Sequence, residues 1–290
     1  MSLSTLLPLV AAFVYAAGAL VVKRAAGLGV GVWRTAFVAN LVGAAVYLPL
    51  LLLGGTFRAD LWWQPVVVGL CFTVGQWLTF TAMDQGDVSV ATPVLGLKIL
   101  FVALLVTLLG GQVLRTELWT AALLATAAII LLNLGGGHPH RRVGRTIVSA
   151  ALAAAAFAVF DFLMQSWSPA WGVGRLVPLT MLAAAVFSCA FVPRFRAPLA
   201  AIPRPAWRWL LAGTATLGLQ SVFFVSTVAH WRNAATANIV YSSRGLWSVV
   251  LVWVVGHWFD SHERHLGGRT LAWRFAGGAL MMGAIFLAVA

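Results

Sequence analysis

Residues 87–98 read DVSVATPVLGLK, and residues 233–244 read NAATANIVYSSR. The two stretches align without a gap at an offset of 146 residues, and each ends on a basic residue, Lys98 or Arg244. The matches in and beyond them are Asp87 with Asn233, Ala91 with Ala237, Val94 with Val240, Phe101 with Trp247 and Gly110 with Gly256. Several matches at one offset indicate an internal repeat.

The repeat extends upstream of both stretches. At an offset of 144 residues, the matches are Gly69 with Gly213, Gln76 with Gln220 and Phe80 with Phe224. A weaker match pairs the AAF of residues 11–13 with the AAF of residues 155–157. We therefore expect two similar units, residues 1–140 and residues 141–290.

The amino-acid composition indicates that lipid surrounds these units. Apolar residues make up 61% of the 290 positions and charged residues only 9%, whereas about a quarter of the residues in a soluble domain are charged. Ten apolar runs have about the 20 residues that a membrane helix needs. They are residues 4–23, 33–54, 62–83, 89–110, 117–135, 146–166, 174–193, 207–228, 235–258 and 270–289. The sequence predicts an all-α polytopic membrane protein with ten transmembrane helices, located in the cell inner membrane.

The number of spans in each unit fixes how the units are related. Two similar units of five spans must enter the membrane from opposite sides, because five is odd. The fold is therefore predicted to be an inverted five-plus-five repeat, an arrangement that permits alternating access to a site near the bilayer midplane.

Several other classes of protein are disfavoured. The net charge is +12, but the basic residues fall mostly in short loops, where they anchor helix ends, so nucleic-acid binding is not expected. The H-x-H of residues 138–140 is a weak metal signal, and no cofactor or metal is expected. No catalytic constellation or ATPase motif occurs, so we expect neither an enzyme nor ATP-driven transport.

The repeat carries a family resemblance. Residues 90–93 (VATP) lead to Leu109-Gly110, and residues 236–239 (TANI) lead to Val255-Gly256. This pattern resembles the EamA-type branch of the drug/metabolite transporter superfamily. The resemblance implies a secondary transporter whose central cavity is lined by the first to fourth and sixth to ninth spans, with the fifth and tenth outside. Residues 111–112 (GQ) depart from the family pattern, which has an acidic residue there.

Lys98 and Arg244 are the leading candidates for substrate binding. Each lies about nine residues into its predicted span, which places it near the midplane. A charge there costs at least about 2.5–3.5 kcal/mol, so each should face a cavity or a partner. Two cations around one cavity favour a substrate with a carboxylate or phosphate. The alternative is that they form scaffold ion pairs, for example between Arg244 and Asp161.

Asp161 has two possible roles. It is the only acidic residue well inside a predicted helix, and a desolvated carboxylate can take up a proton, which would make it a coupling residue. It could instead be a fixed counter-ion of Lys98 or Arg244.

Further candidates surround the two cations in the sequence. The proposed substrate-binding set adds Gln76, Gln220, Tyr241, Trp247, Phe101, Asn238 and Ser243. Amides and hydroxyls can hydrogen-bond a substrate, but they also join membrane helices to one another. The aromatic residues could equally line a cavity, pack or face lipid.

The leading hypothesis is a secondary transporter that moves a small anionic or zwitterionic metabolite, with coupling to protons or a counter-substrate. The first alternative is a proton-coupled exporter of cationic, drug-like compounds that uses Asp161, although Lys98 and Arg244 would repel such a substrate. The second is a non-transporting membrane scaffold. The expected partners are a small molecule and the lipid bilayer; the sequence indicates no oligomeric state.

The orientation in the membrane has two readings. Twelve basic residues follow the first, fifth, seventh and ninth spans, and four follow the second, fourth, sixth and eighth. The positive-inside rule then places both termini outside the cell, whereas proteins of the family it resembles have both termini inside.

Overall fold

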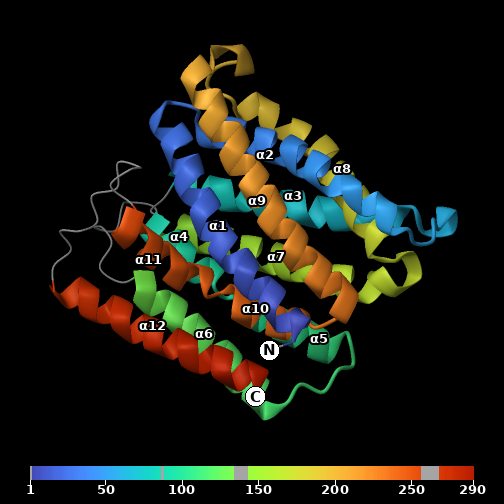
Figure 1. Cartoon of the computed structure of the whole chain (residues 1–290), viewed down its shortest axis with the longest axis vertical. Helices are drawn as coiled ribbons and strands as arrows, with labels where there is room; N and C mark the ends of the chain where they lie inside the picture. Colours follow the sequence, from blue (N-terminus) through green and yellow to red (C-terminus); the bar gives the residue numbers. More distant parts are fainter. Residues whose placement is uncertain (1, 86–87, 134–142, 256–267) are drawn as a thin grey trace.

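The computed structural model describes residues 2–85, 88–133, 143–255 and 268–290 (Figure 1). Within these ranges the chain is helical and contains no strand. The α-helices are α1 (Leu3–Gly27), α2 (Val32–Tyr47), α3 (Trp63–Gln85), α4 (Val88–Leu95), α5 (Lys98–Leu108), α6 (Thr116–Asn133), α7 (Val143–Trp171), α8 (Val173–Phe187), α9 (Arg204–Trp231), α10 (Ala234–Tyr241), α11 (Arg244–Val255) and α12 (Gly268–Val289). Four 3₁₀-helices complete them: η1 (Leu48–Leu53), η2 (Ala59–Leu61), η3 (Ser188–Arg194) and η4 (Leu199–Ala201).

Length and hydropathy identify a multi-pass membrane protein. Among the described residues, seven helical segments are long and apolar enough to cross a bilayer, and Thr116–Leu132 and Phe275–Val289 are shorter apolar helices. Large apolar side chains such as Leu108 and Phe286 are exposed on the outside of the bundle. In a membrane this surface faces lipid, which explains why so few charges are needed. Both termini lie at one end of the bundle (Figure 1).

Two of the predicted spans are each divided into two helices. The predicted span 89–110 corresponds to α4 and α5, and the predicted span 235–258 corresponds to α10 and α11. The breaks are 146 residues apart, and the helix after each break begins at the basic residue of the repeat, Lys98 or Arg244. The predicted unit boundary after residue 140 lies outside the described residues, as do the ends of the predicted spans 117–135 and 235–258.

The first break follows from a proline and a glycine. Pro93 lies inside α4, where it removes one backbone hydrogen bond. The N–H of Gly96 then donates to the Pro93 carbonyl at 3.0 Å, and Leu97 donates to Val94 at 3.0 Å. A Cβ at position 96 would lie 2.9 Å from the Pro93 carbonyl oxygen and 3.1 Å from Ile129 of α6. Glycine is therefore required where the tightened turn packs against α6.

The second break is made by serines. Ser243 donates its N–H to the Val240 carbonyl at 3.1 Å, and Gly245 donates to Ser242 at 3.1 Å. The Ser242 hydroxyl donates to the Ile239 carbonyl at 2.5 Å. Such local side-chain bonds compete with helix hydrogen bonding. Different residues thus interrupt the helix at corresponding positions in the two halves.

The packing of the helices follows the repeat. α1 packs on α9, and α7 packs on α3; likewise α2 packs on α9, and α8 on α3. α5 contacts α7 as α11 contacts α1, and α6 and α12 lie side by side (Figure 1). Each contact becomes its counterpart when the halves are exchanged, as two related units would require. The ten-helix inverted repeat itself stays a prediction.

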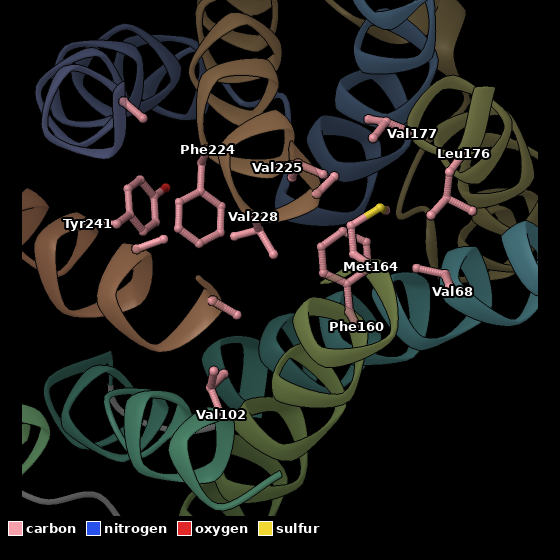
Figure 2. Packing of buried hydrophobic residues seen from close by; sticks show 14 of the residues in the cluster. Val68, Val102, Phe160, Met164, Leu176, Val177, Phe224, Val225, Val228 and Tyr241 are labelled. Carbon is pink, nitrogen blue, oxygen red and sulfur yellow. The ribbon is translucent and has the colours of Figure 1, made fainter. Parts of the chain in front are cut away.

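The main apolar core lies beside the second break. Figure 2 shows Phe224 of α9 next to Tyr241 of α10, with Phe160 and Met164 of α7 further along the same cluster. These side chains are buried. The core therefore fixes α7, α9 and α10 relative to one another, and these helices carry most of the polar residues described next.

Candidate functional site

Lys98 and Asp161 form an ion pair inside the bundle. The Lys98 Nζ lies 2.7 Å from Asp161 Oδ2, and the two side chains are 18% and 1% exposed. Lys98 reaches Asp161 because it is the first residue of α5, which packs on α7. Two roles were predicted for Asp161, coupling residue and counter-ion. The structure contains the contact that a counter-ion would make, and the partner is Lys98.

Asn238 binds the same carboxylate oxygen. Its Nδ2 donates to Asp161 Oδ2 at 2.7 Å and to the Ala234 carbonyl at 2.9 Å. One turn away, the Ala234 N–H donates to Gln165 Oε1 of α7 at 2.8 Å. These bonds hold the N-terminal part of α10 against α7, two helices of the same half. The ion pair with Lys98 joins Asp161 to the break of the other half.

Aromatic rings surround the Lys98 ammonium. Its Nζ lies 5.2 Å from the centre of the Phe224 ring and 5.9 Å from the centre of the Phe157 ring. Cation–π contacts of this kind contribute about 0.5–2 kcal/mol, more where water is excluded. Lys98 is thus neutralised by one carboxylate and enclosed by two rings.

Arg244 has different surroundings. Its guanidinium carbon lies 4.9 Å from the centre of the Tyr15 ring and 4.7 Å from the centre of the Tyr241 ring. The ion pairs between described residues are Lys98 with Asp161 and Arg58 with Asp60, so Arg244 has no carboxylate partner in this part of the chain. Its guanidinium lies against two aromatic rings and also interacts with the Tyr241 hydroxyl.

Tyr241 joins Arg244 to the rest of the site. Its hydroxyl donates to Gln220 Oε1 at 2.9 Å, and its ring lies 4.4 Å from the Phe224 ring. Phe224 in turn contacts Lys98. The neighbouring rings of Phe224 and Tyr241 (Figure 2) therefore connect Lys98 to Arg244.

A small cavity lies between the two breaks. It has a volume of about 30 Å³, and its polar lining comes from Lys98, Asn238, Tyr241, Ser242 and Arg244. This volume holds one or two water molecules. The structure thus brings four predicted residues to one small cavity: Lys98, Asn238, Tyr241 and Arg244.

Other predicted residues lie outside this lining. Gln76 Oε1 accepts a hydrogen bond from Asn40 Nδ2 at 2.7 Å, which joins α3 to α2. Trp247 lies edge-on to Phe13 at 5.3 Å, and Phe101 packs against the main apolar core. These residues serve packing and helix contacts in this conformation.

Several buried polar atoms next to the cavity have no hydrogen-bond partner. They are Asp161 Oδ1, the Ser243 hydroxyl and the Trp247 indole N–H. A buried polar group without a partner costs about 1–3 kcal/mol. Asp161 contacts two of the lining residues, and Ser243 and Trp247 belong to the second break and the helix after it, so these atoms are unused donors and acceptors near the cavity.

Sequence reasoning missed Tyr15, Asn40, Phe157 and the place of Phe224. Phe157 and Phe224 did carry a signal, because both are matched across the repeat, to Phe13 and Phe80. Tyr15 and Asn40 carry none, since neither has a counterpart in the other half. Among the described residues, no group of three His, Cys, Asp or Glu side chains is placed to hold a metal ion.

Comparison with known proteins supports the resemblance seen in the repeat. No curated protein matches the chain. A solved crystal structure has the same fold, with a TM-score of 0.76 over 98% of this chain and 96% of that chain, at 21% sequence identity. Residues 2–134 match the EamA-like transporter family. The first half of the chain is therefore similar to the EamA-like transporter family of the drug/metabolite transporter superfamily.

Proposed function

We propose that this protein is a secondary active transporter that moves a small anionic or zwitterionic metabolite across the inner membrane by alternating access. The proposal rests mainly on the surroundings of the Arg244 side chain. It lines the cavity between the breaks, and its guanidinium contacts two rings but no described carboxylate. A substrate anion would complete its coordination.

The charges set the substrate class. Lys98 and Asp161 neutralise each other at 2.7 Å, so Arg244 leaves one uncompensated positive charge at the cavity. A guanidinium binds a carboxylate or phosphate through two parallel hydrogen bonds. Cation–π contacts of about 0.5–2 kcal/mol offset only part of the cost of a charge at membrane depth. One substrate anion would offset much of the remainder.

A zwitterion has a second point of attachment. Asp161 Oδ1 is buried and has no hydrogen-bond partner, while its Oδ2 is occupied by Lys98 and Asn238. An ammonium group could donate to the free oxygen while the carboxylate of the same molecule binds Arg244. Amino acids have this arrangement of charges.

Alternating access is supported by the small volume of the cavity and by the paired breaks. A metabolite needs far more than about 30 Å³, so loading requires helices to move apart. The two breaks and the exchangeable helix contacts provide two similar moving units, as an inverted repeat requires.

The cationic-drug alternative is less well supported. A cation that used Asp161 would have to displace Lys98 from it and approach Arg244. Proton coupling at Asp161 would likewise have to break the 2.7 Å ion pair. The contact therefore favours a counter-ion role for Asp161.

The test is uptake into proteoliposomes. Purified protein is reconstituted, and uptake of labelled alanine, succinate, glycerol 3-phosphate and tetraphenylphosphonium is measured for the wild type and for Arg244→Gln. Arg115→Gln removes an exposed arginine outside the site and serves as the matched control. We expect saturable uptake of at least one anion or zwitterion, which Arg244→Gln abolishes and Arg115→Gln retains. Uptake of the cation alone, or equal anion uptake in all three proteins, would overturn the proposal.

A further inference from the structure

A second cavity lies at the end of the bundle opposite the termini. Its volume is about 470 Å³. It is lined by the connection between α1 and α2, by Met83 of α3, and by residues 194–196 at the end of η3. It shares no lining residue with the cavity between the breaks. The α8–α9 connection that closes one side is at the top of Figure 1.

Arg34 is a buried cation in the wall of this cavity. It is only 7% exposed. Its Nε donates to the Val30 carbonyl at 2.6 Å, one terminal nitrogen to Gly29 at 2.7 Å and the other to Pro198 at 3.2 Å. Gly29 has a φ of 81°, which turns the connection so that its carbonyl reaches the guanidinium. Arg34 is thus fixed in place by neutral carbonyl groups, and no described carboxylate forms an ion pair with it.

Arg194 is held on the opposite wall by aromatic rings. Its guanidinium carbon lies 4.9 Å from the Trp77 ring and 5.7 Å from the Trp33 ring. Trp33 is itself packed against Trp77 and Phe191. The stacked rings hold an exposed arginine at the cavity instead of leaving it free in solvent.

The cavity combines three cations with an apolar wall. Arg34, Arg194 and Arg196 line it together, and the lining residues that the structure describes include no acidic residue. Val32, Trp33, Met83 and Phe195 supply the apolar part. The volume is that of a small-molecule site. Its position at the helix ends is the depth at which the phosphates of membrane lipids lie.

We propose that this basic pocket binds the phosphate group of an anionic ligand. Guanidinium groups match phosphate through paired, charge-assisted hydrogen bonds, and the apolar wall would lie along the glycerol or carbon chain attached to it. The phosphate could belong to a phospholipid headgroup or to a free phosphorylated solute. In both cases the site is separate from the proposed transport site.

The test compares a double variant with a matched control. Arg194→Gln with Arg196→Gln removes two exposed cations of the pocket and leaves the buried Arg34 in place. The control, Arg208→Gln, removes an exposed arginine near the start of α9 whose guanidinium also stacks on a tryptophan, Trp209, at 5.5 Å. Both variants should fold, which circular dichroism and gel filtration check.

Two binding arms distinguish the sources of phosphate. In the first, native mass spectrometry measures retention of phosphatidylglycerol against phosphatidylcholine. In the second, the melting temperature is followed with glycerol 3-phosphate, inorganic phosphate and succinate at equal ionic strength. We expect binding in at least one arm that weakens about tenfold or more in the double variant and is unchanged in the control. Lipid binding alone assigns a headgroup, and binding of the free phosphates assigns a solute.

Three outcomes would overturn the proposal: no phosphate binding in either arm, equal binding by all three proteins, or succinate bound as tightly as the phosphates. Because both arms measure binding without transport, and because Arg244 is unchanged, failure here leaves the proposed transport function intact.

Discussion

The two breaks place the same charge in different surroundings. In the first half, Lys98 has a carboxylate at 2.7 Å and lies near the rings of Phe157 and Phe224. In the second half, Arg244 lies between Tyr15 and Tyr241 with no carboxylate among the described residues. Related backbone geometry has thus produced one satisfied cation and one available cation. If the proposed function holds, the substrate preference comes from where the halves diverge and not from where they agree.

The largest expected effect is on the satisfied cation. Asp161→Asn removes the counter-ion and leaves a buried lysine charge uncompensated, which costs about 3–5 kcal/mol. We expect a large fall in the melting temperature of the purified protein. Adding Lys98→Gln to the same chain should restore much of the loss, because it removes the orphaned charge. An unchanged melting temperature in Asp161→Asn would show that the ion pair does not stabilise the fold.

The next-largest effect tests whether Arg244 acts through its charge alone or also through the planar shape of its guanidinium group. Arg244→Lys keeps the positive charge but loses the planar group that stacks on Tyr15 and Tyr241 and can bind a carboxylate at two points. We expect substrate affinity to fall about tenfold, which is about 1.4 kcal/mol, with little change in melting temperature. Competition binding in detergent measures this. Wild-type affinity in Arg244→Lys would mean that a point charge is enough.

A smaller effect tests the hydroxyl that supports Arg244. Tyr241→Phe keeps the ring but removes the 2.9 Å hydrogen bond to Gln220, which should cost about 1 kcal/mol of stability. Tyr15→Phe keeps the other ring and is the control, for which we expect a smaller change. Chemical denaturation compares them. Equal losses of stability in the two variants would show that the effect does not come from the hydrogen bond to Gln220.

The smallest effect concerns the glutamines that match across the repeat. Gln76→Leu breaks the 2.7 Å bond with Asn40, and a single interhelical hydrogen bond in a membrane is worth about 0.6 kcal/mol. We expect a slight loss of stability and normal uptake. Loss of uptake without loss of stability would place Gln76 in the substrate path, as its match with Gln220 predicted.

The sequence was informative where a pattern maps directly onto backbone geometry. Apolar runs of membrane length predicted a multi-pass helical protein, and the repeat predicted that Lys98 and Arg244 occupy corresponding places. The breaks were missed because α4 and α5, like α10 and α11, are both apolar, and together they have the length of one span. What divides them is a turn at Gly96 or at residues 242–243, which hydropathy does not detect.

The partners of the cations could not be derived from spacing. Asp161 was left open between Lys98 and Arg244, because the choice depends on how α7 is rotated about its axis. Residues 11–13 and 155–157 match across the repeat, but α7 presents a carboxylate to Lys98 where α1 presents the Tyr15 ring to Arg244. Helix packing determines side-chain environments of this kind, so matched positions in a repeat do not predict them.

The breaks also have an electrostatic consequence of their own. Because α5 begins at Lys98 and α11 begins at Arg244, each break creates a helix N-terminus inside the bundle. The aligned peptide dipoles place roughly half a positive charge at each such end. The C-terminal ends of α4 and α10 are separated from these N-termini by two residues and carry the opposite partial charge, so the dipoles at each break largely cancel. The basic side chains therefore supply the positive potential at the breaks, and a protein in which both are replaced by glutamine should lose its preference for a negative charge there.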